Sequence, residues 1–254
     1  MFHPNFDKGL ILKQHMLEAL RDYPYTFAHT LFTEMGDGIL SGLRISICED
    51  DESFLVSPGL VKLDGEICFL TEAQCQNLKD YQNFVYLEKR PPAPAPDGSG
   101  STRGLHVVQR DAEQEISAGR MELFRYARNP TARVKEFQEI GEIDRDMNNR
   151  IDRSHTLKSV AGGSTLCDEF YTLFARFLLS CPQADARDIG FAYQCLNGIH
   201  TLETVKAYFQ TEDTANDEII RCIMRRVQSL NRQPPSRQNA PPEPKPENHA
   251  VIIS

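Results

Sequence analysis

The chain has 254 residues, 40% of them hydrophobic, and a formal net charge of −8 at pH 7. This length allows a substantial core divided between two modules with tails. The negative charge opposes broad nucleic-acid binding, because that binding depends on positive charge to displace counterions. No apolar run approaches the roughly 20 residues that span a bilayer, and the first residues lack a secretory-signal pattern. We therefore expect cytoplasmic synthesis, no membrane span and no nucleic-acid partner.

The seven cysteines are scattered along the chain without a C-x-x-C pair. We interpret them as isolated buried thiols in a reducing compartment rather than as a disulfide or zinc framework. None of the seven histidines belongs to an H-x-x-x-H or H-E-x-x-H pair. The acidic run at residues 49–52 is more typical of a solvated turn than of a cation site. The sequence therefore predicts no metal centre and no cofactor.

Residues 1–35 are predicted to form a helical docking segment. A helix over residues 7–22 would begin at Asp7, a residue suited to the N-cap, and would end before Pro24. One face of this helix is a narrow leucine stripe that needs a cover, so we predict that it packs on a neighbouring element or on a partner subunit. The candidate interface residues on this face are Leu10, Leu17 and Leu20.

Residues 36–130 are predicted to form a small antiparallel β-sandwich or barrel. Leu43, Ile45 and Ile47 alternate with polar residues at the period of a half-buried strand. The Asp-Gly pair at 64–65 supplies the positive φ angles that a two-residue hairpin turn requires. Further β-rich runs occupy residues 83–89, 105–110 and 121–128.

Residues 90–104 interrupt this β domain. Four prolines precede a Gly/Ser cluster there, and proline cannot donate to the ladder of a central strand. We predict a long, mobile loop. Such a loop either contacts a partner or is an inert insertion.

A connecting segment at residues 131–164 carries charges of both signs without clear periodicity, and it ends in an Ala-Gly-Gly-Ser stretch interpreted as a flexible entry to the next helix. Residues 165–230 are then predicted to form a bundle of four short helices. The predicted helix starts are Thr165, supported by Asp168 three residues later, Ala186, Thr201 and Asn216. Residues 231–254 are rich in proline and lack Phe, Tyr and Trp, so they are predicted to be a disordered tail.

The last predicted helix carries three arginines, Arg221, Arg225 and Arg226. Arg221 and Arg225 lie four residues apart and therefore share a face. They form either a docking patch for an anionic partner or a solvated face that complements the negative C-terminal end of the helix dipole. Arg221 and Arg225 are accordingly candidate interface residues.

Three glycine-bounded segments together resemble a known module. They are residues 36–43 (GDGILSGL), 54–61 (FLVSPGLV) and 64–67 (DGEI). In this order they are similar to a small β domain of baseplate and tail-fibre-attachment proteins of contractile phage tails and phage-tail-like injection systems. The similarity continues through residues 121–129 (MELFRYARN) and more weakly through residues 188–193.

The predicted elements describe an α+β protein with an N-terminal helix, a small antiparallel β-sandwich or barrel and a C-terminal helical bundle. The resemblance implies a non-enzymatic structural protein that is assembled into a phage-tail-like particle. Its implied partners are other baseplate or tail proteins, with multiple copies of the chain in a symmetric assembly, and no catalytic residue is implied. The alternative is a cytoplasmic adaptor or ligand-binding module that uses the β domain for recognition, and an enzyme ranks third.

Overall fold

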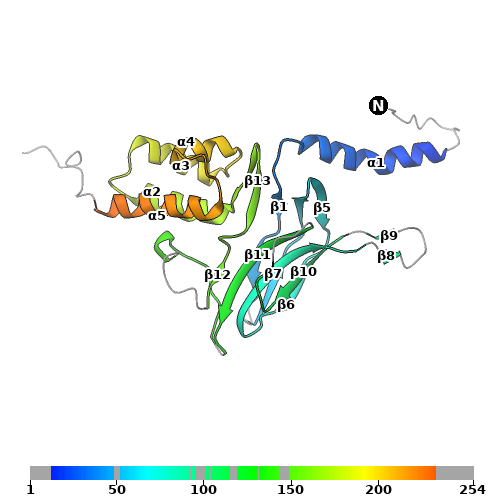
Figure 1. The fold of residues 1–254 in the computed structure, drawn as a ribbon, viewed down its shortest axis with the longest axis horizontal. Coiled ribbons are helices and arrows are strands. Elements are labelled where there is room, and N and C mark those ends of the chain that lie inside the picture. Colours follow the sequence, from blue (N-terminus) through cyan, green and yellow to red (C-terminus); the bar gives the residue numbers. More distant parts are fainter. Residues whose placement is uncertain are drawn as a thin grey trace, which may run out of the picture.

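The computed structural model describes residues 13–48, 52–91, 93–94, 101–102, 104–114, 119–130, 132–142 and 149–232. The sheets occupy the centre of an elongated molecule (Figure 1), with helices α2 to α5 at one end and helix α1 projecting from the other. The predicted α+β class, with its leading helix and mostly antiparallel sheets, is confirmed.

Helix α1 spans Gln14–Leu31 and continues through Pro24. The prediction that Pro24 ends this helix is therefore wrong, and the predicted start at Asp7 lies outside the described residues. A proline inside a helix removes the amide that would bond to the carbonyl four residues earlier. Because Pro24 is exposed, water can bind that carbonyl instead, and the helix tolerates the loss.

Lys62 holds the C-terminal end of α1 against the sheets. Its Nζ atom donates to the carbonyl oxygens of Phe32, Thr33 and Met35 at 3.0, 3.2 and 2.6 Å. These carbonyls lie where the helix dipole is negative, so a cation both satisfies them and stabilises the helix end. The orientation of α1 is therefore set at its base by a residue of strand β4 (Gly59–Leu63).

The largest sheet has five strands in the order β14-β13-β1-β4-β5. Its other strands are β1 (Gly38–Gly42), β5 (Glu66–Leu70), β13 (Leu157–Val160) and β14 (Gly163–Leu166). β1 pairs with β13 in parallel, with Ile39 opposite Lys158, and the other pairs are antiparallel. Asp64 and Gly65 adopt φ angles of 52° and 72° between β4 and β5, which confirms the predicted hairpin turn.

Two further sheets complete the β domain. The first, in the order β2-β3-β6, contains β2 (Ile45–Ile47), β3 (Ser53–Val56) and β6 (Gln74–Asn77). The second, in the order β10-β7-β11-β12, contains β7 (Tyr81–Lys89), β10 (Leu105–Arg110), β11 (Arg120–Arg128) and β12 (Ile151–Asp152). Side chains of Leu43, Phe54, Val61 and Leu123 are fully buried between the sheets.

The sheets do not close into a barrel, so that part of the prediction is wrong. Side chains, not a backbone ladder, bridge the edge of β10 to β6. The amide of Val107 donates to Oε1 of Gln74 at 2.8 Å, and Nε2 of Gln76 donates to the carbonyl of Val107 at 2.7 Å. These bonds satisfy the backbone amide and carbonyl of Val107 at the edge of β10 without adding a strand to the sheet.

Most of the predicted 90–104 loop lies outside the described residues. In its described part, two short strands, β8 (Ala93–Pro94) and β9 (Ser101–Thr102), pair with one another in an antiparallel ribbon. This ribbon stands apart from the three larger sheets, in agreement with the expectation that the segment does not join a central strand. The predicted tail at 233–254 lies outside the described residues.

Four helices follow β14. They are α2 (Asp168–Ser180), α3 (Ala186–Leu196), α4 (Leu202–Phe209) and α5 (Asn216–Arg232). The predicted start of α3 at Ala186 is confirmed. The predicted Thr201 cap of α4 is confirmed as well, because Thr201 accepts a hydrogen bond from the amide of Thr204. The apolar stripe of α5, including Ile219, Ile223 and Val227, is buried.

The predicted helix start at Thr165 is wrong, and Asn216, although α5 begins there as predicted, does not act as its cap. Thr165 does not cap α2, because it lies in β14 and its hydroxyl is 2.6 Å from the hydroxyl of Tyr171. Asn216 lies at the start of α5, but its side-chain amide donates to the carbonyl of Ser154 at 2.7 Å. The Thr165 side chain thus contacts α2, and the Asn216 side chain contacts the connecting segment. The local capping pattern reveals neither contact.

The connecting segment joins the two modules. β12 adds to the β11 edge, and β13 adds to β1, so both belong to sheets of the β domain. Buried side chains of Val160 and Leu166 then pack into the helical core with Leu178 and Val205. The sequence predicts that the Ala-Gly-Gly-Ser stretch at 161–164 is flexible. Instead Ala161 and Gly162 form the turn between β13 and β14, Gly163 and Ser164 begin β14, and the Ala161 amide donates to the His200 carbonyl at 2.9 Å.

Candidate functional site

The glycines of the GDGILSGL segment lie where one backbone touches another. A Cβ atom at Gly36 would lie 2.2 Å from the carbonyl carbon and oxygen of Gly163. At Gly42, with φ of 72°, it would lie 2.3 Å from the carbonyl oxygen of Pro58. No side chain fits at such distances. These glycines therefore position strands and do not bind a ligand.

Asp37, between two of these glycines, also has a structural partner. Its two carboxylate oxygens accept hydrogen bonds from the amides of Asp64 and Gly65 at 2.9 and 3.0 Å. The carboxylate thereby holds the β4–β5 turn against the start of β1. The motif that carries the resemblance thus builds a scaffold, and a docking surface has to be sought elsewhere on the molecule.

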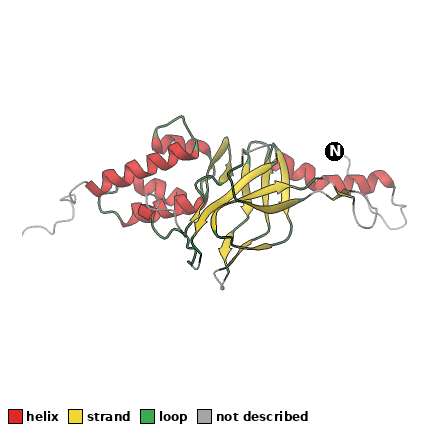
Figure 2. Ribbon diagram, turned by 60° about the horizontal axis from the view of Figure 1, so that its bottom comes forward, coloured by secondary structure: helices red, strands yellow, loops and turns green. Residues whose placement is uncertain are grey.

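Helix α1 presents the main exposed apolar surface of the described chain. It projects beyond the sheets in both ribbon views (Figures 1 and 2), and Met16 is its one buried side chain. The exposed fractions of Leu17, Leu20, Phe27 and Leu31 are 53, 46, 57 and 61%. Isolated exposed apolar residues are ordinary, but a contiguous group of them on one helix marks an interaction surface.

Of the three predicted interface leucines on this helix, Leu17 and Leu20 are exposed, and Leu10 lies outside the described residues. Sequence reasoning missed the remaining part of the surface, formed by Tyr23, Phe27 and Leu31, whereas Tyr25 is exposed on another face of the helix. The assumption that Pro24 ends the helix hid these residues. The available signal was that apolar residues continue at helical spacing on both sides of the proline.

Arg221 and Arg225 lie at the exposed surface of α5, with about two thirds of each side chain accessible. Both bind Glu218 of the same helix, at 3.1 and 2.6 Å. Their charges are therefore partly compensated within one helix. Arg226 points elsewhere and binds Asp188 of α3, so the three arginines do not form one basic patch.

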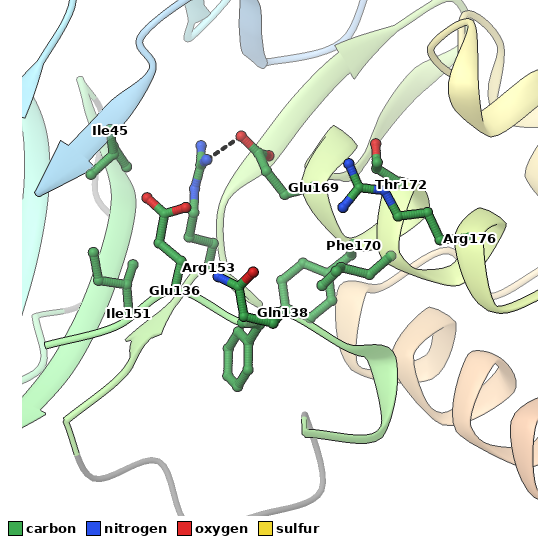
Figure 3. A pocket seen from close by; sticks show the side chains of 11 residues that line it. Ile45, Glu136, Gln138, Ile151, Arg153, Glu169, Phe170, Thr172 and Arg176 are labelled. Atoms are coloured by element: carbon green, nitrogen blue, oxygen red, sulfur yellow. Dashed lines mark hydrogen bonds and ion pairs between the residues drawn. The ribbon is translucent and has the colours of Figure 1, made fainter.

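A cleft of about 290 Å³ lies between the β domain and α2. Figure 3 shows Ile45 and Ile151 on its sheet side and Phe170, Thr172 and Arg176 on its helix side. The polar side chains of the lining are those of Arg153, Arg176, Glu136, Glu169, Gln138 and Thr172.

The charges of the cleft compensate one another in part. Arg153 donates through Nη1 to Glu169 (Figure 3). Burial would raise the pKa of Glu169, but the charge of Arg153 and the hydrogen bonds to the carboxylate together outweigh this effect and lower that pKa. Glu169 is therefore an anion paired with a cation at neutral pH, which is unsuited to a general base.

The buried thiols near this region are unreactive. Burial raises the pKa of both Cys167 and Cys195 to about 12, so neither is a thiolate at neutral pH. Both cysteines are free and pack in the helical core, as predicted. The prediction of buried thiols is wrong for the other five free cysteines, because Cys75 is exposed and the remaining four are only partly buried: Cys48, Cys68, Cys181 and Cys222.

Among the described residues, no group of three His, Cys, Asp or Glu side chains is arranged to hold a metal ion. In the same part of the chain, no helix is both long and apolar enough to cross a membrane.

No protein-family model and no curated protein matches this sequence. Among solved structures, the chain is similar to a chain of the type VI secretion system TssK-TssF-TssG baseplate subcomplex, determined by cryo-electron microscopy. The TM-score is 0.43 at 9% identity, and the match covers 90% of this chain and 99% of that chain. A crystal structure of TssK gives a TM-score of 0.33 at 10% identity, covering 91% of this chain and 55% of that chain. At these values the likeness assigns neither a family nor an activity.

Proposed function

We propose that this chain is a non-enzymatic structural component of a contractile phage-tail-like particle, a baseplate protein that acts by protein–protein assembly. The observation that carries the proposal is the exposed apolar surface of α1, held at its base by Lys62. A helix with such a surface is stable in an assembly that covers it. Other baseplate or tail proteins are the proposed partners, and assembly follows cytoplasmic synthesis.

Two further observations support an assembly role. The segments that resemble baseplate and tail-fibre-attachment proteins contain glycines in tight backbone contact, so the resemblance concerns the scaffold itself. Arg153 and Glu169 of the cleft are paired with each other, and the buried thiols Cys167 and Cys195 are protonated at neutral pH. The proposal therefore assigns no catalytic residue.

Incorporation into the particle tests this function. Leu17→Asp/Leu20→Asp places two carboxylates in the exposed surface of α1, and the expected result is a folded protein absent from purified sheathed particles. Thr26→Asp/His29→Asp is the matched control, because it adds the same charge to the exposed face of α1 opposite the two leucines. Complete particles that contain the leucine variant at the wild-type level would refute the docking role of α1.

A ligand-binding module is the second candidate function, and the cleft beside α2 is the observation that favours it. In that case the purified protein would be a monomer that binds a small molecule between the β domain and α2. An Arg176→Ala variant would then lose binding, whereas Leu17→Asp/Leu20→Asp would keep it. Isothermal titration of each variant with compounds recovered from the native protein measures the affinity that each variant keeps or loses.

A further inference from the structure

The exposed apolar residues of α1 follow the spacing of a coiled-coil seam. Leu17, Leu20, Pro24, Phe27 and Leu31 are separated by alternating intervals of three and four residues. This alternation places side chains in one line along a helix, where they insert between the residues of a second helix. We call these five residues the α1 seam.

The described part of the chain leaves the seam uncovered. All five seam residues are exposed, and α1 projects from the sheets at the end opposite to α2–α5 (Figure 1). Helix α1 contacts strand β5 of the described sheets. The seam is therefore free to lie along another helix without displacing an element of its own fold.

The charges beside the seam suit an identical helix. Arg21 flanks the seam, and its guanidinium binds Asp22 of the same helix at 2.7 Å. Glu18 accepts a hydrogen bond from Gln14 at 2.9 Å. Two copies that pair along the seam would therefore bring apolar side chains together. A row of like charges beside the seam would repel the same row of a second copy, and the seam has no such row among these residues.

The exposed area of the seam lies at the lower limit for an interface between two copies. An aromatic side chain buries on the order of 150–250 Å², and leucine and proline bury less, so complete burial of the exposed parts of the five residues supplies at most roughly 500 Å² per helix and about 1,000 Å² for a pair. That sum reaches the lower limit for a specific interface, about 1,000 Å², before any contact outside α1 is added.

From this spacing, exposure, charge and area, we infer that α1 pairs along its seam with α1 of a second copy of the chain. The inference rests on the proposed function, because it names the partner of the same docking surface. The two copies bury Leu20 and Phe27 near the centre of the contact. In each copy the hydrogen bonds from Lys62 hold the end of α1 on the sheets, so that the rest of the fold does not cover the seam.

Charge exchange at the seam tests this pairing for parallel and antiparallel helices alike. An acidic variant carries Leu20→Asp/Phe27→Asp, and a basic variant carries Leu20→Lys/Phe27→Lys. Sedimentation velocity should show that the full wild-type chain self-associates and that each variant alone is monomeric, with association weakened by roughly tenfold or more. Mixing the two variants should restore association, because opposite charges then face each other.

The restored association also shows that both variants are folded. Thr26→Asp/His29→Asp, the control on the face of α1 opposite the seam, should associate like the wild type. A wild-type chain that stays monomeric up to submillimolar concentration would overturn the pairing. So would variants that self-associate like the wild type, or a mixture that remains monomeric while circular dichroism shows native helix content.

Particle incorporation separates this inference from the proposed function. If the wild type is monomeric and the acidic variant is still excluded from particles, the self-pairing is wrong and α1 docks on a different subunit. If the seam pairs as expected but the acidic variant enters complete particles, the self-pairing stands and the docking role of α1 in assembly is wrong.

Discussion

Arg226 of α5 binds Asp188 of α3 through two hydrogen bonds, from Nε to Oδ1 at 3.0 Å and from Nη2 to Oδ2 at 2.5 Å. The Asp188 side chain is only 1% exposed and also accepts a hydrogen bond from the hydroxyl of Tyr208 at 2.6 Å. A buried carboxylate thus joins three helices of the C-terminal module, and it depends on a single guanidinium for its counter-charge.

We predict that Arg226→Met lowers the free energy of unfolding by about 3 kcal/mol, because it leaves a buried charge without its cation. Arg225→Met is the matched control. Arg225 forms an exposed pair with Glu218 on the same helix, so its loss should change stability by no more than about 1 kcal/mol. Urea denaturation followed by circular dichroism measures both. Equal effects of the two substitutions would contradict the assigned role of Asp188.

The same pair predicts a dependence on pH. Burial would raise the pKa of Asp188, but the hydrogen bonds from Arg226 and Tyr208 outweigh it and hold that pKa below its usual value. The stabilisation is therefore fully present above the unfolded pKa of about 3.9 and is lost as the pH falls through the lower folded value. The stability difference between wild type and Arg226→Met should be largest near neutral pH and narrow in acid. A difference that stays constant down to the acid transition would exclude this linkage.

The elements that could be predicted from sequence are those determined by neighbouring residues. The Thr201 cap needs only the amide of Thr204, and the 64–65 turn needs only two residues with positive φ. The parallel pairing of β1 with β13 joins residues more than a hundred positions apart, and no local pattern reveals it. The extent of the α1 surface was missed because Pro24 breaks helices as a rule, whereas an exposed helix can continue through it.

We predict opposite outcomes for alanine at two glycines. Gly36→Ala should prevent folding or destabilise the protein by more than about 4 kcal/mol, because its Cβ would lie 2.2 Å from the backbone of Gly163. Gly190→Ala should stabilise it by about 0.5–1 kcal/mol, since Gly190 lies inside α3 with no atom near the new methyl group. Soluble yield and thermal melts measure both changes. A stable Gly36→Ala protein would show that a glycine at position 36 is not needed for the backbone contact with Gly163.

Lys62 anchors the C-terminal end of α1 to the sheets. Lys62→Met keeps the length of the side chain but removes three hydrogen bonds from Nζ to the carbonyls of Phe32, Thr33 and Met35. We expect the end of α1 to lose about 1–2 kcal/mol of local stability, because a charged donor to part-buried carbonyls is lost. Hydrogen exchange should become faster at residues 26–36 and remain unchanged at residues 170–178 of α2.

Lys79→Met removes an exposed lysine beyond the end of β6 and serves as the control. It should leave exchange at residues 26–36 unchanged. Because a docking helix must be presented at a fixed angle, Lys62→Met should also reduce incorporation into particles, although it leaves every residue of the α1 seam in place. Wild-type exchange at residues 26–36 in the Lys62→Met protein would show that these carbonyls have other partners. Normal exchange together with reduced incorporation would instead place Lys62 itself at the interface.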